Sequence, residues 1–330
     1  MRRREFITLL GGATVVWPRA AHAQQPERMR RIGVMATLAE TDPVGQAYLV
    51  GFREGLQALG WSEGRNLKLE IRRATTDPES IDRSAKELVA LQPDLILTPN
   101  TPTTAALQRQ TRTIPILFVN VSDPIGSGFV ASLSRPGGNI TGFLTFEFSI
   151  GGKWLELLKE IAPRVNRVAF MFNPNTAPYA ELFLKPFKAA AASLGMSSIA
   201  APVRDASEIE TVVAAHAREP NGGLIVMPDV FLLARRAEVT ALAARYRLPA
   251  VYPFRAFAEI GGLISYGNDN ISIYRRAATY ADRILRGAEP SELPLQFPVK
   301  FELVINRKTA EALGLDVPAS FYWRADEVIE

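Results

Sequence analysis

DLILTPNTPTTAAL, residues 94–107, reads as a buried strand that passes directly into a helix. The apolar run Leu95–Leu97 is typical of a strand covered on both faces. Pro99 and Pro102 end the strand, and threonines crowd the first helical turn. A strand, a turn and a helix in this order are the building unit of an α/β protein.

The first turn of this helix suits an anion, because its unpaired N–H groups and the helix dipole point the same way. Thr101 and Thr103 add hydroxyl donors to the turn. We therefore expect these two threonines to hold a ligand carboxylate. A simple capped helix needs the same residue types, so capping stays open as the alternative.

Five landmarks of the first half of the chain recur in the same order in the second half, at an offset between 136 and 124 residues. The paired segments are Arg31–Met35 with Arg167–Met171, Leu59–Gly60 with Leu194–Gly195, Asp94–Asn100 with Gly223–Asp229, Ile114–Pro115 with Leu248–Pro249, and Gly137–Thr141 with Gly261–Ser265. Each landmark lies at a strand or a helix end. The pattern predicts one five-stranded α/β unit used twice, as two lobes that face each other across a crevice.

Residues 1–23 have the features of an export signal rather than of the fold. Arg2–Arg4 form a basic start, Phe6–Trp17 an apolar run, and Ala21–Ala23 an Ala-x-Ala cleavage site. The segment Arg3–Ile7 looks like the twin-arginine pattern. An ordinary secretory signal or a membrane anchor are the alternatives, but the apolar run is short for a bilayer. We expect cleavage after Ala23 and a periplasmic protein.

The charge balance and the residue inventory exclude several classes of function. Residues 1–23 hold four arginines and one glutamate, so the net charge of +4 falls to +1 without them. That value gives no support to nucleic-acid or anionic-membrane partners. The chain has no cysteine and two histidines, which leaves little for a metal site or a nucleophilic triad. The turn Gly126–Ala131 has a nucleotide-binding shape but follows the wrong strand, so we expect no cofactor.

Several motifs together resemble one protein family. They are the twin-arginine start Arg2–Ile7, the turns Ser122–Pro124 and Pro136–Gly142, the segment Ile305–Leu315 and the tail Arg324–Ile329. In order and joint occurrence they resemble the ABC-transporter substrate-binding proteins related to bacterial tryptophan- and tyrosine-binding proteins. The resemblance covers nearly the whole chain.

The resemblance implies a fold, a role and partners. It implies an α/β protein of type I periplasmic binding protein architecture, with two Rossmann-like lobes, parallel sheets and three hinge crossings. We expect an N-terminal lobe of residues 24–143 plus 268–298 and a C-terminal lobe of residues 144–267 plus 299–330. The lobes would close on a small molecule and deliver it to an inner-membrane ABC permease. We expect a monomer without enzymatic activity, metal or cofactor.

The resemblance also points to site residues. They follow strand ends in both lobes or lie at a crossing: Thr37, Leu38, Asn100, Thr101, Thr103, Ser122 and Asp123 in the first lobe, Asn173, Thr176, Asp229, Tyr252 and Phe254 in the second, and Asp269 at the crossing. For Asp123, a turn that only precedes Pro124 remains the alternative.

The best ligand prediction is an aromatic or large apolar amino acid. Asp123, Asp229 or Asp269 would take its ammonium group, and Tyr252, Phe254 and Phe257 would stack on its side chain, although core packing of such rings is common. An aromatic acid without nitrogen, held by Arg255, is the second ligand prediction. Two other classes of function stay open, an exported enzyme that uses carboxylates and a ligand-sensing module for a separate receptor.

Overall fold

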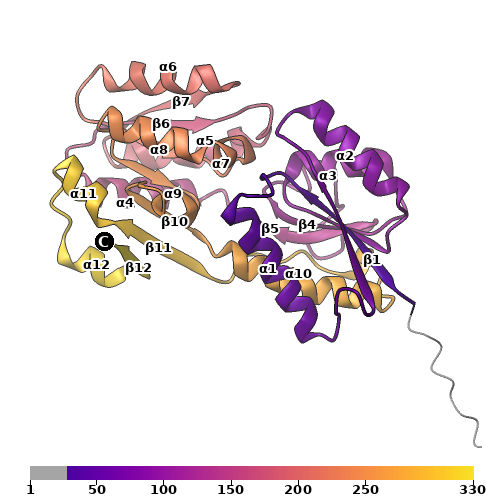
Figure 1. The fold of residues 1–330 in the computed structure, drawn as a ribbon. Helices are drawn as coiled ribbons and strands as arrows, with labels where there is room; N and C mark the ends of the chain where they lie inside the picture. Colours follow the sequence, from indigo (N-terminus) through magenta and orange to yellow (C-terminus); the bar gives the residue numbers. More distant parts are fainter. Residues whose placement is uncertain (1–27) are drawn as a thin grey trace, which may run out of the picture.

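The computed structural model describes residues 28–330, which form two lobes side by side (Figure 1). Each lobe is a β-sheet with helices on both faces. The predicted export signal lies outside the described residues. Within residues 28–330, no helix has the length and apolar character that crossing a membrane requires.

The sheet of the first lobe has five parallel strands in the order β2-β1-β3-β4-β5. The strands are β1 (Arg30–Ala36), β2 (Leu67–Arg73), β3 (Leu95–Thr98), β4 (Ile116–Val121) and β5 (Ile140–Leu144). Its helices are α1 (Pro43–Ala58), α2 (Pro78–Ala90), α3 (Thr101–Gln110) and α10 (Asn270–Leu285). Leu95 and Leu97 face a core shared with α1 and α10, whereas Ile96 faces α2 and α3. The apolar run predicted for a strand covered on both faces is therefore buried on both faces.

The sheet of the second lobe has seven strands in the order β12-β11-β10-β9-β8-β6-β7. The strands are β6 (Arg167–Phe172), β7 (Ser197–Pro202), β8 (Gly222–Val226), β9 (Ala250–Tyr252), β10 (Ile264–Asn268), β11 (Phe301–Asn306) and β12 (Glu327–Ile329). From β6 to β10 the strand order repeats that of β1 to β5, so the predicted duplication is confirmed. The antiparallel strand β11 and the edge strand β12 extend the repeated unit.

Eight helices among the described residues belong to the second lobe, and a short 3-10 helix, η1 (Pro290–Glu292), precedes β11. The helices are α4 (Ile150–Ile161), α5 (Ala180–Ser193), α6 (Ala206–Ala217), α7 (Val230–Ala234), α8 (Arg236–Arg245), α9 (Arg255–Ala258), α11 (Arg307–Leu313) and α12 (Ala319–Arg324). Trp154 is the largest buried side chain of this lobe, and its indole Nε1–H donates to the carbonyl of Tyr266 at 2.7 Å. The indole of α4 is thus fixed against the strand that leads to the first lobe.

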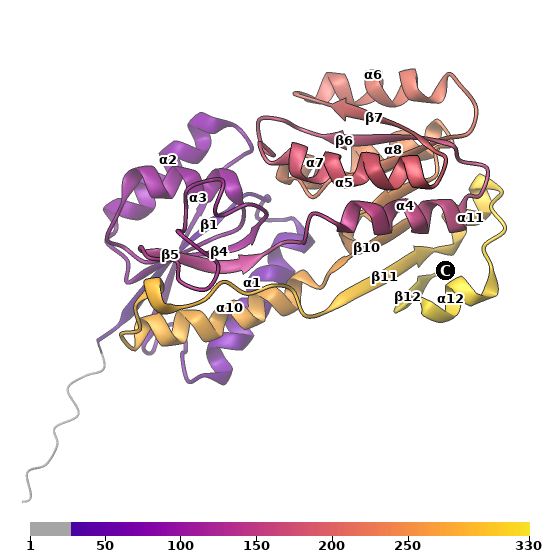
Figure 2. The ribbon, with the colours of Figure 1, turned by 180° about the vertical axis from the view of Figure 1, so that it is seen from behind.

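The chain passes between the two sheets at three places (Figure 2). It leaves the first sheet after Leu144, leaves the second sheet after Asn268, and returns to the second sheet at Phe301. These crossings run through Gly142–Phe146, Tyr266–Asp269 and Pro298–Phe301, which are the candidate hinges of the protein. Three thin connections near one end of an interlobe cleft are the usual basis of a hinge.

Helices α1 and α10 approach each other closely through two glycines. A Cβ atom at Gly55 would lie 2.5 Å from the carbonyl oxygen of Arg275, and one at Gly51 would lie 3.0 Å from Ile271. Alanine at Gly55 would therefore force the two helices apart. The close packing joins the helix that follows the second crossing to the first helix of the chain.

Candidate functional site

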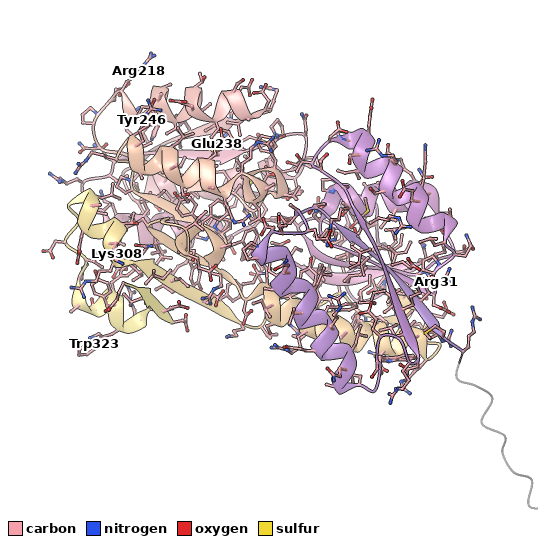
Figure 3. All side chains as sticks on the ribbon, viewed as in Figure 1. Arg31, Arg218, Glu238, Tyr246, Lys308 and Trp323 are labelled. Carbon is pink, nitrogen blue, oxygen red and sulfur yellow. The ribbon has the colours of Figure 1, made fainter. Side chains whose placement is uncertain are left out.

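A cleft lies between the lobes, with about 850 Å³ of empty space including the solvent at its mouth. The first lobe contributes the carboxyl ends of β1, β2, β3 and β4, Thr145 after β5, and the starts of α1 and α10. The second lobe contributes Tyr179, the turn between β8 and α7, and Phe254 after β9. Ligands of parallel α/β sheets commonly bind at the carboxyl ends of the strands. By contrast, Lys308 and Trp323 project from the outer surface of the second lobe (Figure 3).

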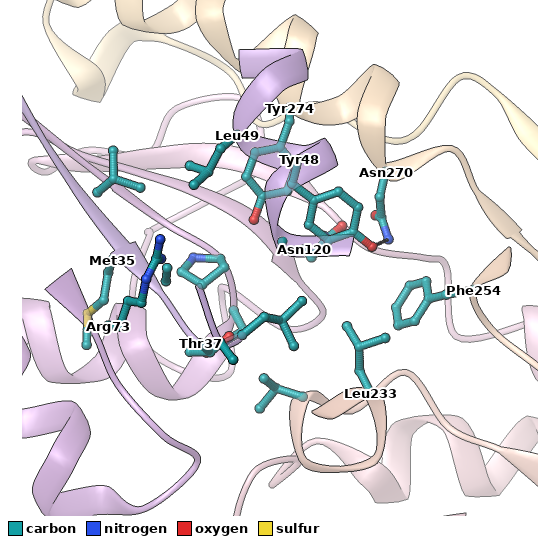
Figure 4. A pocket seen from close by; sticks show the side chains of 18 of the residues that line it. Met35, Thr37, Tyr48, Leu49, Arg73, Asn120, Leu233, Phe254, Asn270 and Tyr274 are labelled. Atoms are coloured by element: carbon teal, nitrogen blue, oxygen red, sulfur yellow. Dashed lines mark hydrogen bonds between the residues drawn. The ribbon is translucent and has the colours of Figure 1, made fainter. Parts of the chain in front are cut away.

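One wall of the cleft is aromatic. The rings of Tyr48 and Tyr274 stack with centroids 4.9 Å apart and planes 14° apart. Leu49 lies beside them, and Leu233 and Phe254 line the cleft from the second lobe (Figure 4). Burial raises the pKa of both tyrosines above the ordinary value, so their hydroxyl groups stay neutral. A flat apolar group fits such a wall, because aromatic rings prefer stacked or edge contacts.

A chain of amide side chains connects this wall to the second crossing. Asn270 Nδ2 donates to the hydroxyl of Tyr48 at 2.9 Å, and Asn268 Nδ2 donates to Asn270 Oδ1 at 2.9 Å and to Asn120 Oδ1 at 3.3 Å. Asn120 has a left-handed backbone (φ 56°) where the register between β4 and β5 shifts. The bulge turns an amide of a buried strand toward the cleft.

Asn100 organises the turn between β3 and α3. Its Oδ1 accepts from the N–H of Thr103 at 3.1 Å, and its Nδ2 donates to Thr37 Oγ1 at 3.3 Å. The hydroxyl of Thr103 lies under this turn, 2.6 Å from that of Thr98. Thr101, by contrast, is 4% exposed, and its Oγ1 has no hydrogen-bond partner among the described residues. The two threonines expected to act together therefore lie in different surroundings.

Asp229 organises the equivalent turn of the second lobe. Its carboxylate accepts from the N–H of Asn173 at 2.6 Å, from Thr176 Oγ1 at 2.7 Å and from the N–H of Phe231 at 2.7 Å. Burial raises the pKa of Asp229 to about 6, and these donors act in the opposite direction. All three donors belong to its own lobe, so most of the lone pairs of the carboxylate are already used.

The structure divides the predicted site residues into three groups. The cleft is lined by Thr37, Leu38, Asn100, Asp229 and Phe254. A second, outer hollow between the lobes is lined by Thr101, Asn173 and Thr176. The remaining predicted residues, Thr103, Ser122, Asp123, Tyr252 and Asp269, line neither space.

Three residues of the third group have structural partners away from the cleft. Asp123 Oδ1 accepts from the N–H of Gly126 at 2.8 Å, as expected for the alternative interpretation of a turn. Asp269 caps α10 and pairs with Lys300 at 2.8 Å. Tyr252 is buried and stacks on Phe257 in the core, with centroids 4.9 Å apart.

Arg255, expected as the anchor of an aromatic acid, also has its own partners. Its guanidinium donates to Glu259 at 2.8 Å, to Glu302 at 3.1 Å and to Glu327 at 2.6 Å. It is absent from the lining of the main cleft. The donors of Arg255 are therefore shared among three carboxylates of the second lobe.

The sequence interpretation missed several cleft residues. Tyr48 and Tyr274 lie on helix faces whose apolar spacing is that of core residues, and Asn270 begins α10. Asn120 offered one signal, since it is a polar residue inside the apolar run ILFVNV. Arg73, at the end of β2, is the one basic residue among those that line the cleft.

An ion pair joins the two lobes beside the cleft. Arg236, at the start of α8 in the second lobe, donates to both carboxylate oxygens of Asp42 in the first lobe, at 2.8 and 2.9 Å. The side chains of Arg236 and Asp42 are only 12% and 15% exposed. Leu38 and Val44 of the first lobe pack against the core of the second. The lobes are thus in direct contact next to the ligand cleft.

The residues 31–329 match the family model described as ABC transporter substrate binding protein. The chain belongs to this family. The function that the description of this family names is substrate binding rather than catalysis. Among residues 28–330, no group of three or more His, Cys, Asp or Glu could hold a metal ion. His216 is buried against Gly222, away from the cleft lining.

Three proteins are similar to this chain over most of their length. A tyrosine-binding protein of Clostridioides difficile (strain R20291) is 24% identical over 265 residues, covering 80% of this chain and 76% of the relative. A conserved domain protein of Vibrio cholerae is 29% identical, with a TM-score of 0.84 over 91% of this substrate-binding protein and 100% of that chain. The ABC domain of Streptococcus pneumonia in complex with L-Trp is 25% identical, with a TM-score of 0.83 over 91% and 99%.

Proposed function

We propose that this protein is the periplasmic solute-binding component of an ABC uptake transporter. It captures an aromatic or large apolar amino acid between its lobes and presents the closed complex to an inner-membrane permease. The observation that carries the ligand class is the stacked pair Tyr48 and Tyr274, which faces Phe254 and Leu233 across the cleft. A flat apolar side chain between these groups would remove apolar surface of both lobes from water, which favours closure.

The relatives support this ligand class. One is named a tyrosine-binding protein, and the structure from Streptococcus pneumonia is a complex with L-Trp. Both ligands combine a flat ring with the charged groups of a free amino acid. The cleft of this protein offers a stacked aromatic wall together with amide and charged side chains. The ring of such a ligand would contact the wall, and its charged groups would contact the polar side chains.

A calorimetric titration tests the proposal. The purified protein is titrated with tryptophan, tyrosine, phenylalanine and leucine, and with glutamate and ribose as controls. We expect binding of at least one aromatic amino acid, and no binding of the controls. Native mass spectrometry of the freshly purified protein adds an independent test, since a tightly held ligand would be carried through purification. Tight binding of a sugar without any amino-acid binding would refute the ligand class.

A second ligand class, an aromatic carboxylic acid without an amino group, is favoured by one observation. The carboxylate of Asp229, the buried acid of the cleft, already accepts three hydrogen bonds from its own lobe. It therefore has little capacity left for a ligand ammonium group. Titration with 3-phenylpropionate beside phenylalanine separates the two classes, because the two molecules differ in the amino group.

The periplasmic location rests on the signal predicted for residues 1–23. Replacement of both Arg3 and Arg4 by Lys is expected to keep the protein in the cytoplasm if export uses the twin-arginine route. Cell fractionation followed by mass measurement of the exported form tests both the route and cleavage after Ala23. Export of the double variant at the normal level would indicate the general secretory route.

A further inference from the structure

Arg73 is the basic residue of the cleft lining, and its one contact with an acid among residues 28–330 is long. It ends β2, at one edge of the first sheet, and lines the cleft. Its guanidinium donates no hydrogen bond within residues 28–330, and the nearest carboxylate oxygen, Glu40 Oε1, is 3.7 Å away. Glu40 itself is 83% exposed. An arginine presents five donors in a planar fork, so this one is open to a planar anion.

The neighbouring Arg72 shows the ordinary situation for this strand. It does not line the cleft; its Nε donates to Glu87 at 3.1 Å, and its Nη1 donates to the carbonyl of Ile71 at 3.0 Å. Successive side chains of a strand point to opposite faces, so only one of the two arginines reaches the cleft. The pair gives a matched comparison of an arginine that donates hydrogen bonds with one that donates none.

Of the two acids in the cleft wall, only Glu40 lies beside Arg73. The charged residues of the lining are Arg73, Glu40 and Asp229. Asp229 is engaged by three donors of the second lobe, and burial raises its pKa to about 6, which reduces its negative charge in mildly acidic conditions. Glu40 is therefore the one acid beside Arg73 that is free to take part in ligand binding.

The position of Arg73 is opposite to the amide groups of the cleft. Figure 4 shows Arg73 next to Met35 on one side, with Asn270 and Phe254 on the other and the two tyrosines between these ends. Strands β2 and β4 are separated by β1 and β3, which corresponds to roughly 14 Å between strand axes at the usual spacing. The cleft thus has a charged end and an amide end, joined by the aromatic wall.

We propose that Arg73 and Glu40 form the head-group site for the ligand of this cleft: Arg73 binds the carboxylate in bidentate fashion, and Glu40 binds the ammonium group. The inference rests on the proposed amino-acid function and deepens it. An arginine and a glutamate 3.7 Å apart present the charges opposite to those of an α-amino acid. The side chain of the ligand then lies along Tyr48 and Tyr274. This assignment replaces the expectation that Thr101, Thr103 and an aspartate bind the head group.

Four proteins and three ligands test the assignment. The proteins are the wild type, Arg73→Gln, Glu40→Gln and the control Arg72→Gln. The ligands are phenylalanine with both charges, 3-phenylpropionate with the carboxylate alone, and phenethylamine with the ammonium group alone. Each pair is titrated by calorimetry at low and at high salt, and circular dichroism checks that every variant folds.

We expect Arg73→Gln to lower the affinity for phenylalanine and for 3-phenylpropionate at least about tenfold. Arg72→Gln should leave both affinities unchanged. Glu40→Gln should lower the affinity for phenylalanine, while the affinity for 3-phenylpropionate stays equal or increases. If the wild type binds phenylalanine and Arg73→Gln binds it equally well, the head-group assignment is wrong and the proposed function stands. If the wild type binds no aromatic amino acid in any condition, the proposed function fails, and this inference with it.

Discussion

Asn100 and Asp229 occupy the same position in the two lobes, and each ties two loops of its own lobe together. Each follows a proline at the end of the third strand of its unit and caps the helix that comes next. Each also reaches the loop after the first strand, Asn100 at Thr37 and Asp229 at Asn173 and Thr176. The duplication therefore extends from strand order to the hydrogen bonds that shape the cleft.

The first prediction concerns the pH dependence of stability. The carboxyl of Asp229 has an ordinary pKa of 3.8 and a pKa of about 6 in the folded protein. Because the folded-state pKa is raised, the folded state binds the proton more strongly. The contribution to stability is full below pH 3.8 and is lost as the pH rises through 6. The whole effect is at most roughly 3 kcal/mol, from 1.36 kcal/mol per pKa unit.

Urea unfolding of the wild type and of Asp229→Asn at pH 4.5, 5.5 and 7 measures this effect. The wild type should lose stability relative to the variant as the pH rises, since asparagine does not titrate. The same comparison with Asp316→Asn, at an exposed position, controls for the exchange of an aspartate for an asparagine. A difference for Asp229→Asn that stays constant with pH would mean that the pKa of Asp229 is not raised.

The second prediction separates Thr101 from Thr103. Thr103→Val removes a buried hydroxyl that bonds to Thr98 and Asn100, so we expect a loss of roughly 1–3 kcal/mol in the free energy of unfolding. Thr101→Val removes a hydroxyl without a partner among the described residues, so stability should stay nearly unchanged. Thermal unfolding of the two single variants without ligand checks this. Equal losses would show that Thr101 also supports the turn.

The fold was largely accessible from the sequence. Apolar strands, Pro and Gly punctuation and five recurring landmarks predicted two α/β units, and the strand orders of the two sheets agree. Strands β11 and β12 were not foreseen as parts of the second sheet, because they have no counterpart in the first lobe. Strands that are present in only one of the two repeated units leave no matching landmark in the other unit.

The residues of the cleft were harder to predict from the sequence, for a physical reason. Polar residues that end strands serve equally well in turns and as helix caps, as Asp123 and Asp269 show. The aromatic wall lies on helices, where Tyr48 and Tyr274 follow the same spacing as core residues. Sequence spacing identifies the face of a helix, but it does not reveal where that face passes from the core into a cleft.

The third prediction compares two phenylalanines three residues apart. Phe254 lines the cleft, whereas Phe257 is fully buried and stacks on Tyr252. Phe257→Ala should therefore cost roughly 3–5 kcal/mol of stability. Phe254→Leu should lower the affinity for aromatic amino acids with a smaller effect on unfolding. Parallel calorimetry and urea unfolding distinguish the two roles, and a reversed pattern would contradict the proposed aromatic contact.

The fourth prediction concerns closure of the lobes. Asp42→Asn keeps an oxygen for capping α1 but removes the charge that pairs with Arg236. We expect ligand affinity to fall at least about tenfold, which corresponds to 1.4 kcal/mol. Small-angle scattering should show compaction of the wild type with ligand and incomplete compaction of the variant at the same concentration.

An exchanged pair supplies the control for that experiment. The double variant Asp42→Arg with Arg236→Asp keeps one charge of each sign across the cleft, so it should recover part of the affinity that each single variant loses. Unchanged scattering of the wild type at saturating ligand would contradict hinge closure itself.

The packing of α10 against α1 has a consequence for biosynthesis. The partner that covers Phe52 and Leu56 of α1 follows almost the whole second lobe in the chain, at residues 270–285. During translation, at roughly 5–20 residues per second, part of the apolar surface of the first lobe stays exposed until α10 has been synthesised. The strands β6 to β10, by contrast, are contiguous in the chain. The nascent protein can therefore assemble the parallel part of its second sheet before the lobe that was synthesised first is complete.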